Sequence, residues 1–176
     1  MMELSGPGGH LDHFIRQTRV HHVQLSSMAD VKANMMLTIS ALIITFSIGH
    51  LSNPLLRWPV LVLIASCLAT IISAAYAVMP KLDRRFRPDL DNPDCNILFF
   101  GNFMNLEYEE YARLMEGVMN DASRVYEVQV REVYELGVFL GRRKYVYVRL
   151  AYLFFIVGLL ASVAVFAGIE ILAAPR

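Results

Sequence analysis

Three long stretches without charged residues constrain this chain more than any other feature of its sequence. No Asp, Glu, Lys or Arg occurs from Ala33 to Leu56, from Trp58 to Pro80, or from Leu150 to Ile169. A helix needs roughly 20 residues to cross about 30 Å of hydrocarbon at about 1.5 Å per residue, and each stretch is long enough. The sequence therefore predicts an all-α membrane protein with three transmembrane helices.

The first two apolar stretches are separated only by a turn cluster, Ser52–Pro54, and by Arg57. Pro59 suits a helix start, so these stretches predict a tight transmembrane hairpin. A cleaved signal peptide is not expected, because the first apolar stretch is too long and turns straight back into the second. We expect the hairpin over residues 34–79, with helices near 34–51 and 58–79, and a third transmembrane helix over 150–172.

The distribution of basic residues predicts the orientation in the membrane. Three lie before the first span and eleven lie in residues 80–149, whereas the hairpin turn and the tail carry one each. Because positive charge accumulates on the cytoplasmic side, we expect the amino terminus in the cytoplasm and the carboxyl terminus outside. Residues 1–33 then form a cytoplasmic amino-terminal helix, and residues 80–149 form a cytoplasmic helical segment.

The segment 80–149 is too long for a simple loop and carries eleven basic and twelve acidic side chains. Asn105 could cap a helix that begins at Leu106, and Asn120 or Asp121 either restarts this helix or lies within it. Apolar residues then follow at helical spacing towards the third span. We expect this helix to run into that span, and a helix at 12–32 to run into the first. Together they predict a small helical cytoplasmic bundle.

Several classes of function are disfavoured by what the sequence lacks. The formal net charge is zero, so no overall basic field favours a nucleic-acid polymer as partner. Nucleophile elbows, phosphate-binding loops and zinc-protease motifs are missing from the sequence, so we do not expect an enzyme. The neighbouring His21 and His22 point about 100° apart on a helix and no ligand set completes a shell, so no metal is expected.

Small residues recur along the spans and favour close helix packing in lipid. They either close the three-helix unit on itself or form a subunit interface of a homo-oligomer, which we also expect. These residues are Ala65, Ala69, Ser73 and Ala77 in the second span, and Gly158 with Ser162 and Ala164 with Gly168 in the third.

Two polar groups stand out against this background. The arginines 124, 131, 142 and 143 could bind a phosphate while Tyr126 and Tyr134 stack on a base, or they could pair with Glu127, Glu132 and Glu135. Asp30, Lys32 and Asn34 lie at the mouth of the first span. There Lys32 could extend to the interface and Asp30 could face water, which is the simpler interpretation.

Three sequence blocks match a known family in order and spacing. HHVQLSSMADVKANMMLTIS precedes and enters the first span, NILFFGNFMNLEYEEY follows the second, and an Arg-x-x-Tyr-x-Leu-Gly motif occupies residues 131–137. From about His21 to Phe166 the chain resembles the Pycsar-system effectors, small bacterial membrane proteins. The resemblance implies an antiphage effector of the bacterial inner membrane. A partner pyrimidine nucleotide cyclase makes cyclic UMP or cyclic CMP, and the effector senses it and impairs the membrane, which ends in abortive infection.

Such a ligand would need an arginine for its phosphate, amide donors and an aromatic face for its base. With the resemblance in view, our candidates in the segment 80–149 are Arg131, Tyr134, Asn96, Gly101 and Asn102. A second group at the membrane mouth, for binding or coupling, comprises His22, Asp30, Lys32 and Asn34. The sequence has too few β-rich runs for a β-roll nucleotide-binding domain. The alternative function is a membrane anchor that recruits a soluble partner through residues 80–149.

Overall fold

The computed structural model describes residues 8–79 and 95–173, and 86% of these residues are helical, with no strand among them. The prediction of an all-α protein is thereby confirmed. The basic cluster at 81–87, on which part of the orientation argument depends, lies outside the described residues. The elements are α1 (Gly9–Ile48), α2 (Arg57–Val78), α3 (Phe100–Phe103), α4 (Tyr108–Met119), α5 (Ala122–Phe139), the π-helical segment η1 (Leu140–Lys144) and α6 (Tyr145–Ala173).

Three helical stretches are long and apolar enough to cross a membrane, as the sequence predicts. They lie within α1, within α2 and within the continuous run from Ala122 to Leu172 that joins α5, η1 and α6. At about 1.5 Å per residue, the 40 residues of α1 exceed the hydrocarbon thickness. The amino-terminal helix thus continues into the first span, and the last helix of the middle segment continues into the third. The orientation and the four segment boundaries remain predictions.

The chain divides into two compact units. Unit 1 comprises the described residues of 1–25 and 80–140, and unit 2 comprises those of 26–79 and 141–176. The helix α1 contributes to both. On the last long helical run the boundary falls inside η1, between Leu140 and Gly141.

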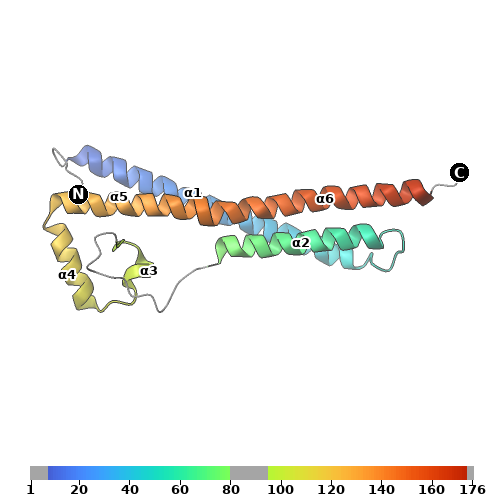
Figure 1. Ribbon diagram of the computed structural model, residues 1–176, viewed down its shortest axis with the longest axis horizontal. Helices are drawn as coiled ribbons and strands as arrows, with labels where there is room; N and C mark the ends of the chain where they lie inside the picture. The colour runs from blue at the N-terminus through green and yellow to red at the C-terminus, as the bar shows by residue number, and fades with distance from the viewer. Residues whose placement is uncertain (1–7, 80–94, 174–176) are drawn as a thin grey trace. The chain divides into compact units, whose positions relative to one another are not determined.

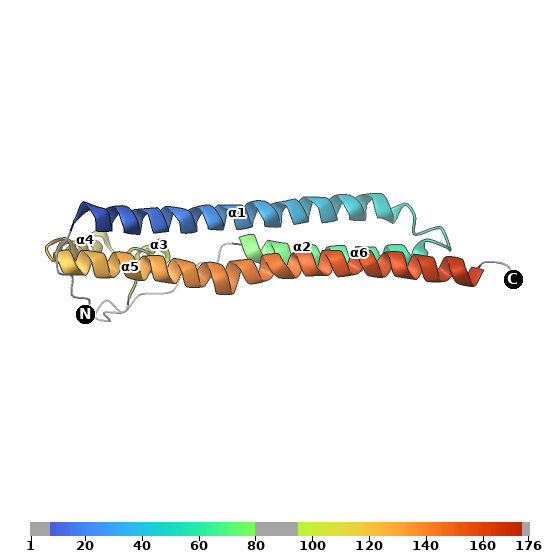
Figure 2. The same cartoon turned by 90° about the horizontal axis from the view of Figure 1, so that it is seen from above.

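In unit 2, α2 runs beside α6 (Figures 1 and 2) and approaches it very closely. A Cβ atom built on Gly158 would lie 2.0 Å from Cβ of Ser66, so only glycine fits there. One turn further along α6, the buried Ser162 hydroxyl donates to the Pro59 carbonyl at 2.9 Å. Gly158 and Ser162, both expected to mediate packing, therefore join two spans of the same chain.

At the other end of unit 2, small side chains from three helices form the core. Ala29, Ala33 and Met36 of α1 meet Ala74 and Ala77 of α2 and Val148 and Ala151 of α6. The small-residue stripe of α2 is only partly used: Ser73 and Ala77 are buried, whereas Ala65 is exposed. Because α2 packs against neighbours over a wider face, its buried surface also includes Cys67 and Thr70.

Between α1 and α2 the chain reverses through residues 49–56. The Asn53 side chain accepts the Leu55 N–H at 3.0 Å, an Asx-type turn that holds Pro54 in place. Pro59 lies in the first turn of α2, where its missing N–H costs little. These contacts explain how the Ser52–Pro54 cluster produces the tight reversal that the sequence predicts.

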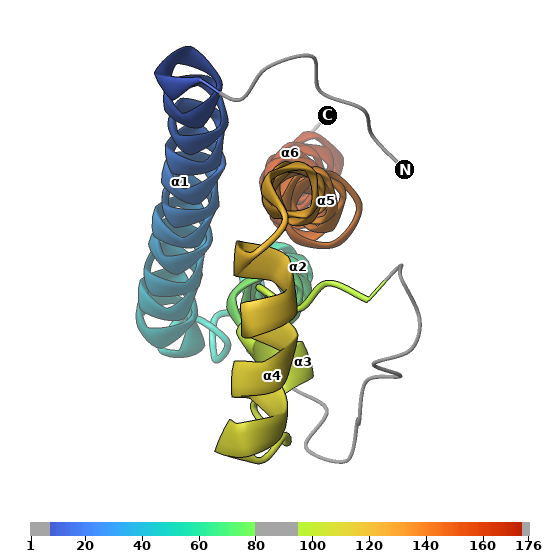
Figure 3. The same ribbon diagram turned by 90° about the vertical axis from the view of Figure 1, so that its left-hand side faces the viewer.

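In unit 1, α4 leads up to the start of α5 and extends away from it at a steep angle (Figure 3). The Asp121 side chain accepts the N–H groups of Ser123 and Arg124 at 2.9 and 3.3 Å, so it caps a new helix. The predicted helix start at Leu106 is wrong, because α4 begins at Tyr108 with Glu107 at the cap position. A turn that follows α3 includes Leu106, whose N–H donates to the Phe103 carbonyl, so Asn105 does not cap α4.

Candidate functional site

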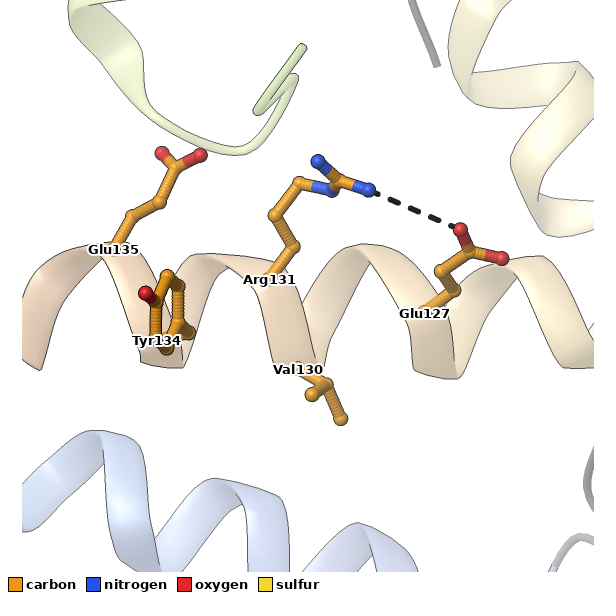
Figure 4. Close-up of a pocket in the computed structure, with 5 residues that line it drawn as sticks. All are labelled: Glu127, Val130, Arg131, Tyr134 and Glu135. Carbon is orange, nitrogen blue, oxygen red and sulfur yellow. Dashed lines mark ion pairs between the residues drawn. The ribbon is translucent and has the colours of Figure 1, made fainter. Parts of the chain in front are cut away.

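An open groove of about 390 Å³ runs along α5 and contains two of the predicted ligand residues, Arg131 and Tyr134. Its other lining residues, Glu127, Val130 and Glu135, also belong to α5. Positions three and four apart share a helix face, which is why these five residues line one surface. Figure 4 shows Arg131 and Glu135 on the same side of the helix, with Tyr134 beside them.

The polar groups of the groove are accessible. Arg131 faces Glu127 across 3.9 Å, and both side chains are partly exposed. An ion pair of this kind contributes about 0–1 kcal/mol. The Tyr134 ring is 69% exposed and offers an aromatic face to a base. The groove thus combines a guanidinium and an aromatic ring within one turn of helix.

Asn96 braces the groove from the segment that precedes α3. Its Nδ2 donates to Oε2 of Glu135 at 2.9 Å, and its Oδ1 accepts the N–H groups of Leu98 and Phe99 at 3.1 and 3.2 Å. Only 3% of Asn96 is exposed. The Asn102 side chain donates to the Asn96 carbonyl at 2.8 Å. Both amides therefore hold the 96–103 segment together, and Asn96 positions a groove carboxylate.

Gly101 has a steric role in the same segment. A Cβ atom there would lie 2.4 Å from the Phe99 ring, so glycine lets that ring cover the backbone. The rings of Phe99 and Phe100 lie 5.0 Å apart and are half exposed or nearly so. The absence of a side chain at Gly101 thus lets an aromatic ring lie over the backbone of the 96–103 segment.

The second predicted group is divided between the two units. Asp30 belongs to unit 2, where its Oδ2 accepts a hydrogen bond from Nζ of Lys144 at 2.7 Å. Lys144 is 8% exposed and also donates to Oγ of Ser26 at 2.8 Å. Lys32 and Asn34 are exposed in the same unit. Of the predicted group, Asp30 thus forms a polar cluster with Ser26 and the buried Lys144, and a binding or coupling role for the group stays a prediction.

His22 lies in unit 1 and packs against α5. A Cβ atom on Gly137 would lie 3.2 Å from Cε1 of His22, so Gly137 leaves room for the imidazole. The buried Nδ1 of His22 has no hydrogen-bond partner within the described part of the chain. His22 therefore contributes to helix packing in unit 1, apart from the Asp30 group.

Polar bridges join α1 to α5 inside unit 1. Arg19 pairs with Glu132 at 2.9 Å, and the Tyr126 hydroxyl donates to Oδ1 of Asp12 at 2.7 Å. Burial raises the pKa of Glu132, and Arg19 only partly opposes the shift. The hydrogen bond to the Asp12 carboxylate raises the pKa of Tyr126. These bridges occupy one face of α5, and two of the glutamates that we considered as partners of the arginines have other partners.

Comparison with known proteins identifies the family of this chain. The family described as Pycsar effector protein domain, PycTM, matches residues 13–169. The chain belongs to this family. Neither the curated proteins nor the solved structures returned a match.

Membership supports an antiphage role for this Pycsar effector and implies a partner cyclase in the same system. Together with the three apolar helices, it indicates a multi-pass membrane protein. The family match covers both the α5 groove and the Lys144–Asp30 pair, so both lie within the effector domain itself.

Sequence reasoning missed the central residue of the membrane-mouth site in this effector. In the sequence, Lys144 is only one of the eleven basic residues of the segment 80–149. The available signal was Asp30, because an acidic residue at the mouth of a span needs a cationic or polar partner. Nothing in the sequence singled out Lys144 from Arg142 and Arg143, since the π-turn that separates them is not readable from these residues.

Metal ligation finds no support in the described residues of the effector. Within residues 8–79 and 95–173, no group of three or more His, Cys, Asp or Glu side chains could hold an ion.

Proposed function

We propose that this Pycsar effector senses cyclic UMP or cyclic CMP at the α5 groove and then impairs the inner membrane, which ends in abortive infection. The observation that carries the proposal is the pair of a partly exposed Arg131 and an exposed Tyr134 on the helical run that continues into the third span. The guanidinium suits the single phosphate, and the phenol ring suits the flat base. The protein needs no cofactor and no catalytic step of its own for this role.

Signal transmission requires two arrangements of the helices that the ligand binds with different affinity. The segment η1 supports such a change, because a π-turn inside an α-helix is a common location for functional distortion. Five residues after the end of α5, Lys144 bonds to Asp30 and Ser26 of α1. A shift of η1 that moves Lys144 would loosen α1 from α6 within unit 2. Assembly into a homo-oligomer would then give a membrane lesion large enough to admit a dye.

The test is nucleotide binding to the purified full chain together with dye entry into cells that co-express a pyrimidine cyclase. We expect binding of one cyclic pyrimidine nucleotide and dye entry only when that nucleotide is made. Arg131→Ala should weaken binding by about 10–100-fold, the value of a charged hydrogen bond. Tyr134→Ala should weaken it by about tenfold, the value of one stacking contact.

Arg124→Ala is the matched control, because Arg124 is an exposed arginine on α5 that does not line the groove. Equal losses in Arg124→Ala and Arg131→Ala would contradict a site at the groove. Dye entry that occurs without any cyclic nucleotide would contradict gating. If the chain neither binds a nucleotide nor permits dye entry, the anchor function that recruits a soluble partner through residues 80–149 replaces this proposal.

A further inference from the structure

We propose that unit 2 carries a binding surface for acidic phospholipid headgroups, formed by Lys32, Arg142, Arg143 and Arg149. We call these four residues the basic collar. All four side chains are exposed, and no ion pair joins any of them to another described residue. This inference goes beyond the proposed function, because it concerns the lipid and needs no nucleotide.

The charge of this end of unit 2 is strongly one-sided. Asp30 and Glu170 are the acidic residues of unit 2 in the part of the chain that the structure describes. Glu170 lies near the far end of α6, and Asp30 is bonded to Lys144 at 2.7 Å. The internal pair therefore neutralises the Asp30 carboxylate, and no other acidic residue among the described residues of unit 2 lies near the collar to offset its positive charge.

The collar lies where lipid headgroups must be. Arg149 directly precedes the uncharged stretch Leu150–Ile169, and Lys32 directly precedes the uncharged stretch Ala33–Leu56. Arg142 and Arg143 lie about 10 Å further along the helical run, at about 1.5 Å per residue. The headgroup layer extends roughly 5–8 Å beyond the hydrocarbon on each side. Long basic side chains can bend towards that layer, so all four cations can reach phosphates.

The segment η1 contains three consecutive basic residues whose side chains differ in exposure. Lys144 is buried against α1, whereas Arg142 and Arg143 are exposed. Guanidinium groups match phosphate oxygens with two parallel hydrogen bonds, which a single ammonium does not. Aromatic residues at the same end complete an interfacial belt: the rings of Tyr76 and Tyr147 stack at 5.7 Å. The π-turn thus supplies both the internal pair and the outward arginines.

The test uses the purified full chain in nanodiscs of equal phosphatidylcholine and phosphatidylglycerol, without nucleotide. Native mass spectrometry of the protein released from the discs gives the preference for retained phosphatidylglycerol. We expect the wild-type chain to prefer phosphatidylglycerol. In the double variant R142Q/R143Q this preference should be about 25-fold lower, at about fivefold per cation removed. R142K/R143K keeps the charge but loses the paired guanidinium hydrogen bonds, so it should keep only part of the preference.

The matched control is R16Q/R124Q, which removes two exposed arginines of unit 1, outside the collar and away from the uncharged stretches, and should leave the preference unchanged. An equal loss in both glutamine variants would overturn the proposal, because general charge would then explain the effect. Equal retention of the two lipids by the wild-type chain would also overturn it. So would loss of the preference in millimolar inorganic phosphate, since the surface would then be a site for a free anion. None of these outcomes depends on nucleotide sensing, so the proposed function stands or falls separately.

Discussion

The two units of this protein achieve stability by opposite means. Unit 1 buries few apolar side chains, among them Val118, Tyr126 and Val128, and its helices are joined by polar bridges such as Arg19–Glu132. Unit 2 packs fully buried alanines, Cys67 and Thr70 between its helices. At Gly158, α6 approaches α2 so closely that no side chain fits between them. Its polar bridge, Lys144–Asp30, is largely buried on the lysine side.

The difference follows from the solvent of each unit. Lipid provides no hydrophobic drive for helix association, so small residues and close contact must supply the energy in unit 2. The polar bridges of unit 1 are partly buried, but few apolar side chains are buried beside them, so unit 1 is the more adaptable part. A unit that must respond to a ligand benefits from such adaptability. We therefore expect substitutions to be more damaging in unit 2 than in unit 1.

The largest effect is expected for Asp30→Ala. The substitution leaves the Lys144 ammonium buried without its carboxylate, at an expected cost of about 3 kcal/mol in the free energy of unfolding. Hydrogen exchange of unit 2 in micelles measures the change. Glu170→Ala, which removes an exposed acid near the end of α6, should have no such effect. The double variant D30A/K144M should recover most of the loss, and no recovery would contradict the pair as its cause.

The second prediction compares one substitution in both units. Gly158→Ala should destabilise unit 2 by about 2 kcal/mol, because its Cβ would lie 2.0 Å from Cβ of Ser66 and the helices must separate. Gly137→Ala in unit 1 meets only the His22 ring at 3.2 Å and should be close to neutral, since alanine also favours the helix. Thermal unfolding followed by circular dichroism compares them. Rescue of Gly158→Ala by Ser66→Gly is expected, and similar losses at both glycines would refute the contrast between units.

A moderate effect is expected for Asn96→Ala in unit 1. The variant loses three hydrogen bonds of a side chain on a residue that is 3% exposed, which should cost about 1–2 kcal/mol. The rate of amide hydrogen exchange should rise over residues 96–103 and stay the same in unit 2. Asn102→Ala, which loses a single bond to the Asn96 carbonyl, should show a smaller rise. A rise of the same size in both variants would argue against Asn96 as the main brace.

The smallest effect is expected for Glu132→Gln. The direction of its change in the free energy of unfolding is the informative result. Burial raises the folded-state pKa of Glu132 above the ordinary value of 4.5, so the folded protein binds the proton more tightly than the unfolded chain. This contribution to stability is fully present below pH 4.5 and is lost as the pH rises through the folded-state pKa. At neutral pH, Glu132→Gln should therefore match or slightly exceed the wild type.

The control for this prediction is Arg19→Met, which removes the opposing cation 2.9 Å away and should destabilise unit 1 at neutral pH. Chemical unfolding at pH 4 and pH 7 separates the two variants. A clear loss of stability for Glu132→Gln at pH 7 would show that the ion pair outweighs the burial of the carboxylate.

Helix boundaries show how far local sequence signals reach. The sequence leaves open the choice between Asn120 and Asp121, and between a new helix and a continued one, and the structure assigns the cap to Asp121. At Asn105 a similar capping signal failed, because a turn that follows α3 delays the start of α4 to Tyr108. A capping side chain predicts a boundary only where the preceding segment leaves its position free, and tertiary packing decides that.

The sequence by itself determined the three spans and the continuity of the long helices, because length, hydropathy and periodicity act locally along the chain. It also indicated Arg131 and Tyr134, which share a helix face by spacing alone. Only the tertiary structure decided that Lys144 meets Asp30, that Gly158 meets Ser66, and that Asn96 braces Glu135. Each of these contacts joins residues of different helices or segments, so it depends on how the elements pack and rotate. No spacing along one element encodes that arrangement.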